Sequence, residues 1–161
     1  MSIIPRDQHI VDKLAEKYSD ATDELNGLVK LILTFAGEYF ADCRGTVVKF
    51  FFTLKPLNDH AGYCKKLDNA VRFKLGVDFF VILDKKEFDD TNRIGKAKLI
   101  IHELHHIGRD DKGQPVIRNH NERENFCELP THDLFSENVV QKLRDRLTQP
   151  ALEGEIVETV T

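Results

Sequence analysis

The chain has 161 residues, enough for one domain with a hydrophobic core. Hydrophobic residues make up 41% and charged residues 31%, as in soluble globular proteins, and a formal net charge of −4 argues against a nucleic-acid-binding face. The three cysteines lie far apart and form no CxxC pair, which argues against a disulfide framework and against a cysteine-ligated zinc site.

The ends of the chain carry no pattern that suggests export. The first residues, MSIIPRDQHI, lack a charged segment followed by an apolar one, and no apolar run reaches the length of a membrane span. We therefore expect a cytoplasmic protein with no membrane or nucleic-acid partner. We expect one domain over residues 1–161, in which residues 150–161 form a flexible tail or an added edge strand.

The N-terminal third predicts two helices. Ile10, Val11 and Leu14 lie at helical spacing, which predicts a first helix over residues 7–18. Apolar residues then recur at intervals of three and four over residues 24–43, which predicts a second helix. Thr22 or Asp23 can cap its start, and Gly45 can end it in the left-handed conformation.

The middle of the chain predicts strands. Residues 46–54 are mostly β-branched and aromatic, residues 70–75 alternate apolar and polar, and residues 77–84 are almost wholly apolar. The last two segments, divided by Gly76, are either two strands or one strand with a bulge. Residues 55–69 contain Pro, Asn, Asp and Gly and are read as a loop. The apolar segment 77–84 is either a core strand or the sheet edge on which an extended peptide could pair.

The remainder predicts two further helices. Residues 85–107 should be mostly helical, capped by Asp89, Asp90 or Thr91 and ended by Gly108. A turn follows over residues 110–115, and residues 116–131 are ambiguous. Apolar residues from Asp133 onward predict a last amphipathic helix.

The stretch LIIHELHHIG contains the pattern His-Glu-x-x-His at His102, Glu103 and His106. Residues four apart on a helix are separated by a rise of roughly 6 Å, so both imidazoles can face one metal ion. Glu103 lies about 100° around the helix axis, where a carboxylate can take a proton from a metal-activated water. The pattern predicts a zinc site; the alternative is a chance occurrence of the same residues on a helix without a metal ion. His105, in the same turn, is expected to pack or to support the ligands.

A catalytic zinc ion needs a third protein ligand, which must come from farther along the chain. A histidine six residues after the second ligand is excluded, because Lys112 stands there. We expect His132 to be the third ligand, with Asp133 capping the last helix or orienting a ligand. The alternatives are His120 and the acidic residues Glu122, Glu124, Glu128, Asp133 and Glu137.

Three segments, DFFVILDKKEFD, KAKLIIHELHHIGRDDKGQPVIR and HDLFSENVV, together resemble the putative phage metallopeptidase family, over residues 46–147. The resemblance implies a zincin-like α/β (α+β) fold: a small, mostly antiparallel or mixed sheet packed against N-terminal helices and the motif helix. It also implies a zinc peptidase with one Zn²⁺ per chain and a peptide or protein substrate. His102, His106 and His132 would then be the metal ligands and Glu103 the general base.

Two other functions share these residues. A zinc site closed by a fourth protein ligand would stabilise the fold without catalysis. A regulatory or phage-interaction protein could keep a silenced peptidase site while another surface does its work. Cys127 would separate the alternatives, because a thiolate on the metal would close the site. The groups considered for stabilising an oxyanion are His105, Arg109, Arg118 and His120.

Overall fold

The computed structural model describes residues 7–37, 40–119 and 144–148. Within them, four strands form one mixed sheet: β1 (Tyr18–Asp20), β2 (Val48–Thr53), β3 (Gly62–Lys66) and β4 (Phe79–Asp84). The strand order is β1-β2-β4-β3. Strands β2 and β4 are parallel, and the two outer pairs are antiparallel. The expected α+β class with a small mixed sheet is confirmed.

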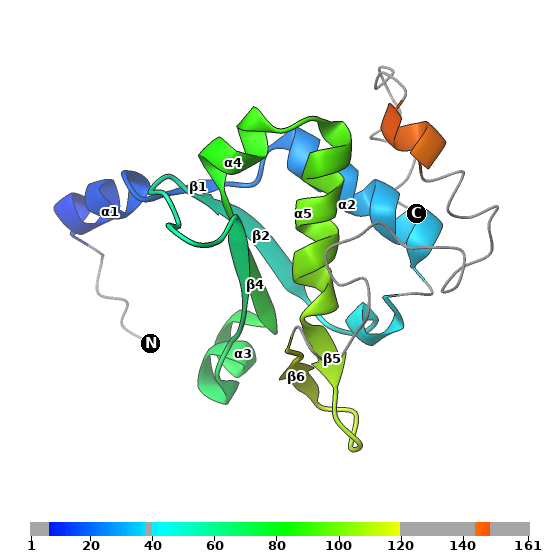
Figure 1. Cartoon of the computed structure of the whole chain (residues 1–161). Helices are drawn as coiled ribbons and strands as arrows, with labels where there is room; N and C mark the ends of the chain where they lie inside the picture. Colours follow the sequence, from blue (N-terminus) through cyan, green and yellow to red (C-terminus); the bar gives the residue numbers. More distant parts are fainter. Residues whose placement is uncertain (1–6, 38–39, 120–143, 149–161) are drawn as a thin grey trace.

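One face of the sheet is covered by α2 (Asp23–Ala36) and α5 (Arg93–His105) (Figure 1). Both helices direct apolar side chains onto it, as the wide apolar stripe of α2 predicts. The core forms between these layers from buried side chains that include Leu25, Ile32, Phe52, Phe79, Val81, Leu83, Ile100 and Ile101. This packing fixes α5 against the sheet, and with it the motif that α5 carries.

The N-terminal helices match the prediction in kind but not in length. Helix α1 (Gln8–Ala15) lies inside the predicted range, and Thr22 caps α2 by accepting a hydrogen bond from the Leu25 amide. Helix α2 ends at Ala36 instead of continuing to residue 43, because Gly37, a poor helix former, follows as the C-cap. A short 3-10 helix, η1 (Ala41–Cys43), precedes Gly45, which has the expected positive φ of 75°.

The predicted strand over residues 70–75 is wrong, because these residues form helix α3 (Asn69–Leu75). Capping at both ends explains the difference. The side chain of Asp68 accepts a hydrogen bond from the Val71 amide, and Gly76 ends the helix with a φ of 65°. Alternation over six residues is therefore a weaker signal here than the two caps that flank it.

The predicted loop over residues 55–69 contains strand β3, and this strand lies at the edge of the sheet. Strand β4 was the candidate edge strand, but it pairs with β2 on one side and β3 on the other. Its side chains Phe79, Val81 and Leu83 belong to the core. The edge-strand interpretation of β4 is thus wrong and its core interpretation is correct.

The segment after β4 contains two helices, α4 (Lys85–Asp90) and α5, with Asn92 as the N-cap of α5 in place of the predicted candidates. Gly108 does not end the helix as expected. It lies in β5 (Ile107–Arg109), which forms a hairpin with β6 (Pro115–Ile117) through a turn containing Gly113 at φ 77°. Residues 144–148 are helical, and the rest of the predicted last helix lies outside the described residues, as does the predicted tail. None of the described helices has both the length and the apolar character that crossing a membrane requires.

Candidate metal centre

The last turn of α5 and its C-cap carry the predicted motif. His102 and Glu103 lie within α5, and His106 is the C-cap residue, still in the right-handed helical conformation. The ring centroids of His102 and His106 are 5.4 Å apart, with 76° between the ring planes. The spacing expected of residues one helical turn apart is therefore realised, and both imidazoles lie on one side of the helix.

The carboxyl group of Glu103 lies between the two imidazoles. Its Oε1 is 4.0 Å from Nε2 of His102, and its Oε2 is 3.9 Å from Nε2 of His106. The residue is only 3% exposed, and Oε2 has no hydrogen-bond partner among the described residues. A buried carboxyl oxygen without a partner is unfavourable unless a cation or a water molecule satisfies it.

Burial also changes the acidity of this group. It raises the pKa of Glu103 to about 8, because the charged carboxylate loses its hydration in the protein interior. A nearby divalent cation would favour the charged form and act against this shift. A divalent cation beside Glu103 would therefore offset the cost of burying its charged form.

The orientation of the His106 ring is fixed by a backbone group. Nδ1 of His106 lies 2.7 Å from the carbonyl oxygen of Arg118, and the Arg118 amide donates to the His106 carbonyl at 2.7 Å. A carbonyl can only accept, so Nδ1 carries the proton and the neutral ring keeps its lone pair on Nε2. That is the tautomer needed to bind a metal ion through Nε2.

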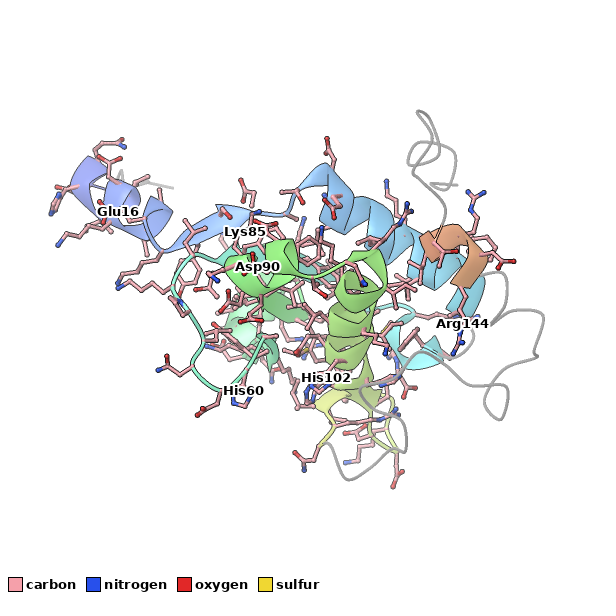
Figure 2. The ribbon with its side chains drawn as sticks, turned by 45° about the horizontal axis from the view of Figure 1, so that its top comes forward. Glu16, His60, Lys85, Asp90, His102 and Arg144 are labelled. Carbon is pink, nitrogen blue, oxygen red and sulfur yellow. The ribbon has the colours of Figure 1, made fainter. Side chains whose placement is uncertain are left out.

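A cavity of about 490 Å³ opens beside the two imidazoles. Strand β3 and the end of β6 contribute walls, and the loop before β3 contributes His60, whose side chain lies at the same end of the molecule as His102 (Figure 2). The cavity is lined by His60, Gly62, Tyr63, Cys64, His102, His106, Ile117, Arg118 and Asn119. The motif thus faces an open space large enough for part of a peptide.

Among the cysteines that the structure describes, Cys64 lines this cavity. Burial, and then the neighbouring Glu103 and Cys43, raise the pKa of its thiol well above the usual value. A thiol held in its neutral form is a poor metal ligand and a poor nucleophile. Cys127, the cysteine considered from the sequence, lies outside the described residues.

The other candidates from the sequence have different surroundings. His105 is 1% exposed and its ring packs against Phe40, 5.3 Å between centroids, which agrees with the expected packing role. The guanidinium of Arg109 donates to the carbonyl groups of Gly113 and Arg44, and that of Arg118 pairs with Asp42. These contacts hold both arginines in place.

Sequence reasoning missed His60 and Gly62. His60 lies in a polar loop with no motif around it. Gly62 lies in an unpredicted strand, so no local signal connected either residue with the helix. The third-ligand candidates, His132 first and then His120 and the acidic residues 122–137, lie outside the described residues. Within the described ranges no three His, Cys, Asp or Glu side chains are placed to share a metal ion, so the third ligand stays a prediction.

The residues present fit a zinc ion in their chemistry. Two imidazoles one helical turn apart are donors that zinc accepts, and the neighbouring carboxyl oxygen without a partner is placed where a metal-bound water could satisfy it. The hydrogen bond from His106 to Arg118 supplies the outer support that metal-ligating histidines generally have.

Comparison with known proteins gives one result. A family model described as "Putative phage metallopeptidase" matches residues 7–151, which is most of the chain. The searches of curated proteins and of solved structures gave no match. The family match extends to the N-terminal helices, beyond the segments whose resemblance was apparent from the sequence.

Proposed function

The chain belongs to the family of putative phage metallopeptidases, and we propose that it hydrolyses peptide bonds at a zinc ion bound by His102 and His106. His132, from outside the described residues, is the proposed third ligand. One observation carries the proposal: the buried carboxyl of Glu103 lies about 4 Å from Nε2 of both imidazoles, and these imidazoles line an open cavity. The proposed metal ligands therefore adjoin both the proposed base and the cavity that would hold the substrate.

Each part of the site has a distinct task in this reaction. A bound zinc ion supplies Lewis acidity, which acidifies water and polarises the scissile carbonyl. Glu103 takes a proton from the attacking water as the oxygen bonds to the carbonyl carbon, and it returns that proton to the amide nitrogen as the C–N bond breaks. The raised pKa of Glu103 favours return of the proton, and a cation nearby favours the ionised form that accepts it.

Strand β3 is the proposed docking edge for the peptide. It pairs with β4 on one side only among the described strands, and Gly62 and Cys64 on it line the cavity. An extended peptide added to this edge would gain main-chain hydrogen bonds. Those bonds would carry its backbone past Glu103, which contacts β3 at Gly62. This placement moves the docking role from β4, where the sequence suggested it, to β3.

The experiment combines metal analysis with cleavage. The purified protein is expected to hold about one zinc ion per chain and to cleave members of a quenched fluorescent peptide library. Glu103→Gln should keep the zinc and lose at least about a hundredfold in rate, since the carboxylate can no longer accept the proton. Asp89→Asn, in an exposed ion pair on α4, is the control and should retain both properties.

The same measurements separate the proposal from its alternatives. Absence of zinc from the protein would contradict the metal site. Zinc bound without cleavage of any library member, together with loss of folding on chelation, would instead indicate a structural metal site. Where cleavage is found, N-methylating single amides of the best peptide should abolish it at positions that pair with β3.

A further inference from the structure

His106 is joined to Arg118 by one backbone hydrogen bond and one side-chain hydrogen bond, directly beyond the β5–β6 ladder. The ladder ends with the pair Ile107 and Ile117, and His106 and Arg118 are the adjacent residues. The Arg118 amide donates to the His106 carbonyl, and Nδ1 of the imidazole donates to the Arg118 carbonyl, both at 2.7 Å. The backbone position of Arg118 therefore determines where the His106 ring points.

The side chain of Arg118 is held along its length. It crosses Gly108 so closely that a Cβ atom there would lie 2.5 Å from Nε and 2.8 Å from Cγ of Arg118. Beyond Gly108 the guanidinium ends in an ion pair with Asp42 of η1. Only glycine at position 108 leaves room for this course. The arginine is thus fixed between the hairpin and a segment distant in sequence.

The segment around η1 contacts the end of α5 and the hairpin at other points too. The Phe40 ring lies 5.3 Å from that of His105, the residue before His106. The Arg109 guanidinium donates to the carbonyl of Arg44. Residues 40–44 therefore form a brace, with Asp42 as its link to the residue that orients His106.

We propose that Asp42 and Arg118 are positioning residues for the metal ligand His106, an inference that rests on the proposed function. Asp42 holds the Arg118 side chain, the Arg118 carbonyl holds Nδ1, and Nε2 stays directed at the metal. Supporting partners of metal-bound histidines typically change metal affinity by about 10–100-fold when removed. The Arg118–Asp42 ion pair is only partly buried and contributes little to folding by comparison, so zinc affinity is the property that should respond.

The test measures zinc affinity by competition with a chromophoric chelator, in the full chain. Asp42→Asn should weaken binding about tenfold, and Gly108→Ala should do the same by displacing Arg118 from the other side. Arg118→Lys keeps the carbonyl and the charge but replaces the planar guanidinium that reaches Asp42, so it should show the same weakening. Asp89→Asn, which breaks a comparable Asp–Lys pair on α4, should leave zinc affinity unchanged.

A second readout distinguishes positioning from general loosening of the fold. In nitrogen-detected NMR of the metal-free protein, the Nδ1 proton of His106 should be protected from exchange in the wild type and exchange faster in Asp42→Asn. The melting temperature of that variant should match the Asp89→Asn control. Zinc affinity within twofold of wild type in folded Asp42→Asn and Arg118→Lys would overturn the inference, whereas a wild-type protein that binds no zinc would overturn the proposed function itself.

Discussion

Gly62 on the edge strand β3 lies against the carboxyl group of Glu103 on α5. A Cβ atom at residue 62 would be 3.3 Å from Oε1 of Glu103, 2.9 Å from the Ile82 carbonyl oxygen and 2.7 Å from a Leu83 methyl. The carbonyl belongs to the backbone of β4 and cannot move aside without disturbing the sheet. The closest approach between strand and motif helix therefore depends on the absence of a side chain at position 62.

Gly62→Ala should damage both the fold and the site. The extra methyl must displace β3 or the Leu83 side chain, which is expected to cost about 1–3 kcal/mol of the free energy of unfolding. Because the same shift moves β3 relative to Glu103, catalysis should fall further than stability alone explains. Urea unfolding and cleavage assays would measure the two effects. Lys65→Ala, at an exposed position of the same strand, is the control, and equal results for both variants would contradict this account.

Glu103 should make the stability of the metal-free protein depend on pH. Burial raises its pKa from 4.5 to about 8 in the folded state. Between these values the folded protein keeps a proton that the unfolded chain has lost. The contribution of this group is therefore complete below about pH 4.5 and lost as the pH rises toward 8. The expected slope is at most about 1.4 kcal/mol per pH unit.

Urea unfolding of the chelator-treated protein between pH 5 and pH 8 would test this expectation. Wild type should lose stability with rising pH relative to Glu103→Gln, whose amide has no proton to lose. The two neighbouring imidazoles are the same in both proteins, so the difference between the two curves is the informative quantity. Parallel curves would show that the carboxyl is ionised throughout.

The motif was predictable because its signal is local. Apolar spacing before His102 and the His-Glu-x-x-His pattern lie within α5 and its C-cap, and helical geometry alone brings the two imidazoles together, although the N-cap itself, Asn92, was not among the predicted candidates. The same holds for α2 and for β4. Each is a continuous segment whose own residues specify its structure and its buried face.

Most of the features that the sequence did not predict depend on contacts between residues far apart in the chain. Strand β3 has five residues, GYCKK, with no strand signal of their own, and it is held by pairing with the apolar β4. Pairing with a core strand overrides weak local preference. Residues 70–75 were predicted as a strand from their alternation, whereas the caps at both ends of α3 make them helical. The ion pair of Asp42 with Arg118 joins residues far apart in the chain, and no spacing rule indicates it.

Substitutions of the three histidines should show which of them bind the metal ion and which pack in the protein interior. His102→Ala and His106→Ala should each lose most of the bound zinc, since one imidazole cannot hold the ion with the remaining ligands. His105→Phe should keep the zinc, because a phenyl ring can take the buried place against Phe40. Zinc content by mass spectrometry after gel filtration measures all three. Retention of zinc by His106→Ala with loss from His105→Phe would reassign the second ligand to His105.

Removing the metal should destabilise the protein and restoring it should reverse the effect. A ligand that binds only the folded state adds about 2.7 kcal/mol when its free concentration is a hundred times the dissociation constant. For a domain of this size, that corresponds to a rise in melting temperature of roughly 5–10 °C. Glu103→Gln should show an equal or smaller rise, since its two histidines remain but the negative charge beside the ion is lost. A melting temperature that is the same with chelator and with added zinc in both proteins would mean that the two imidazoles hold no metal ion.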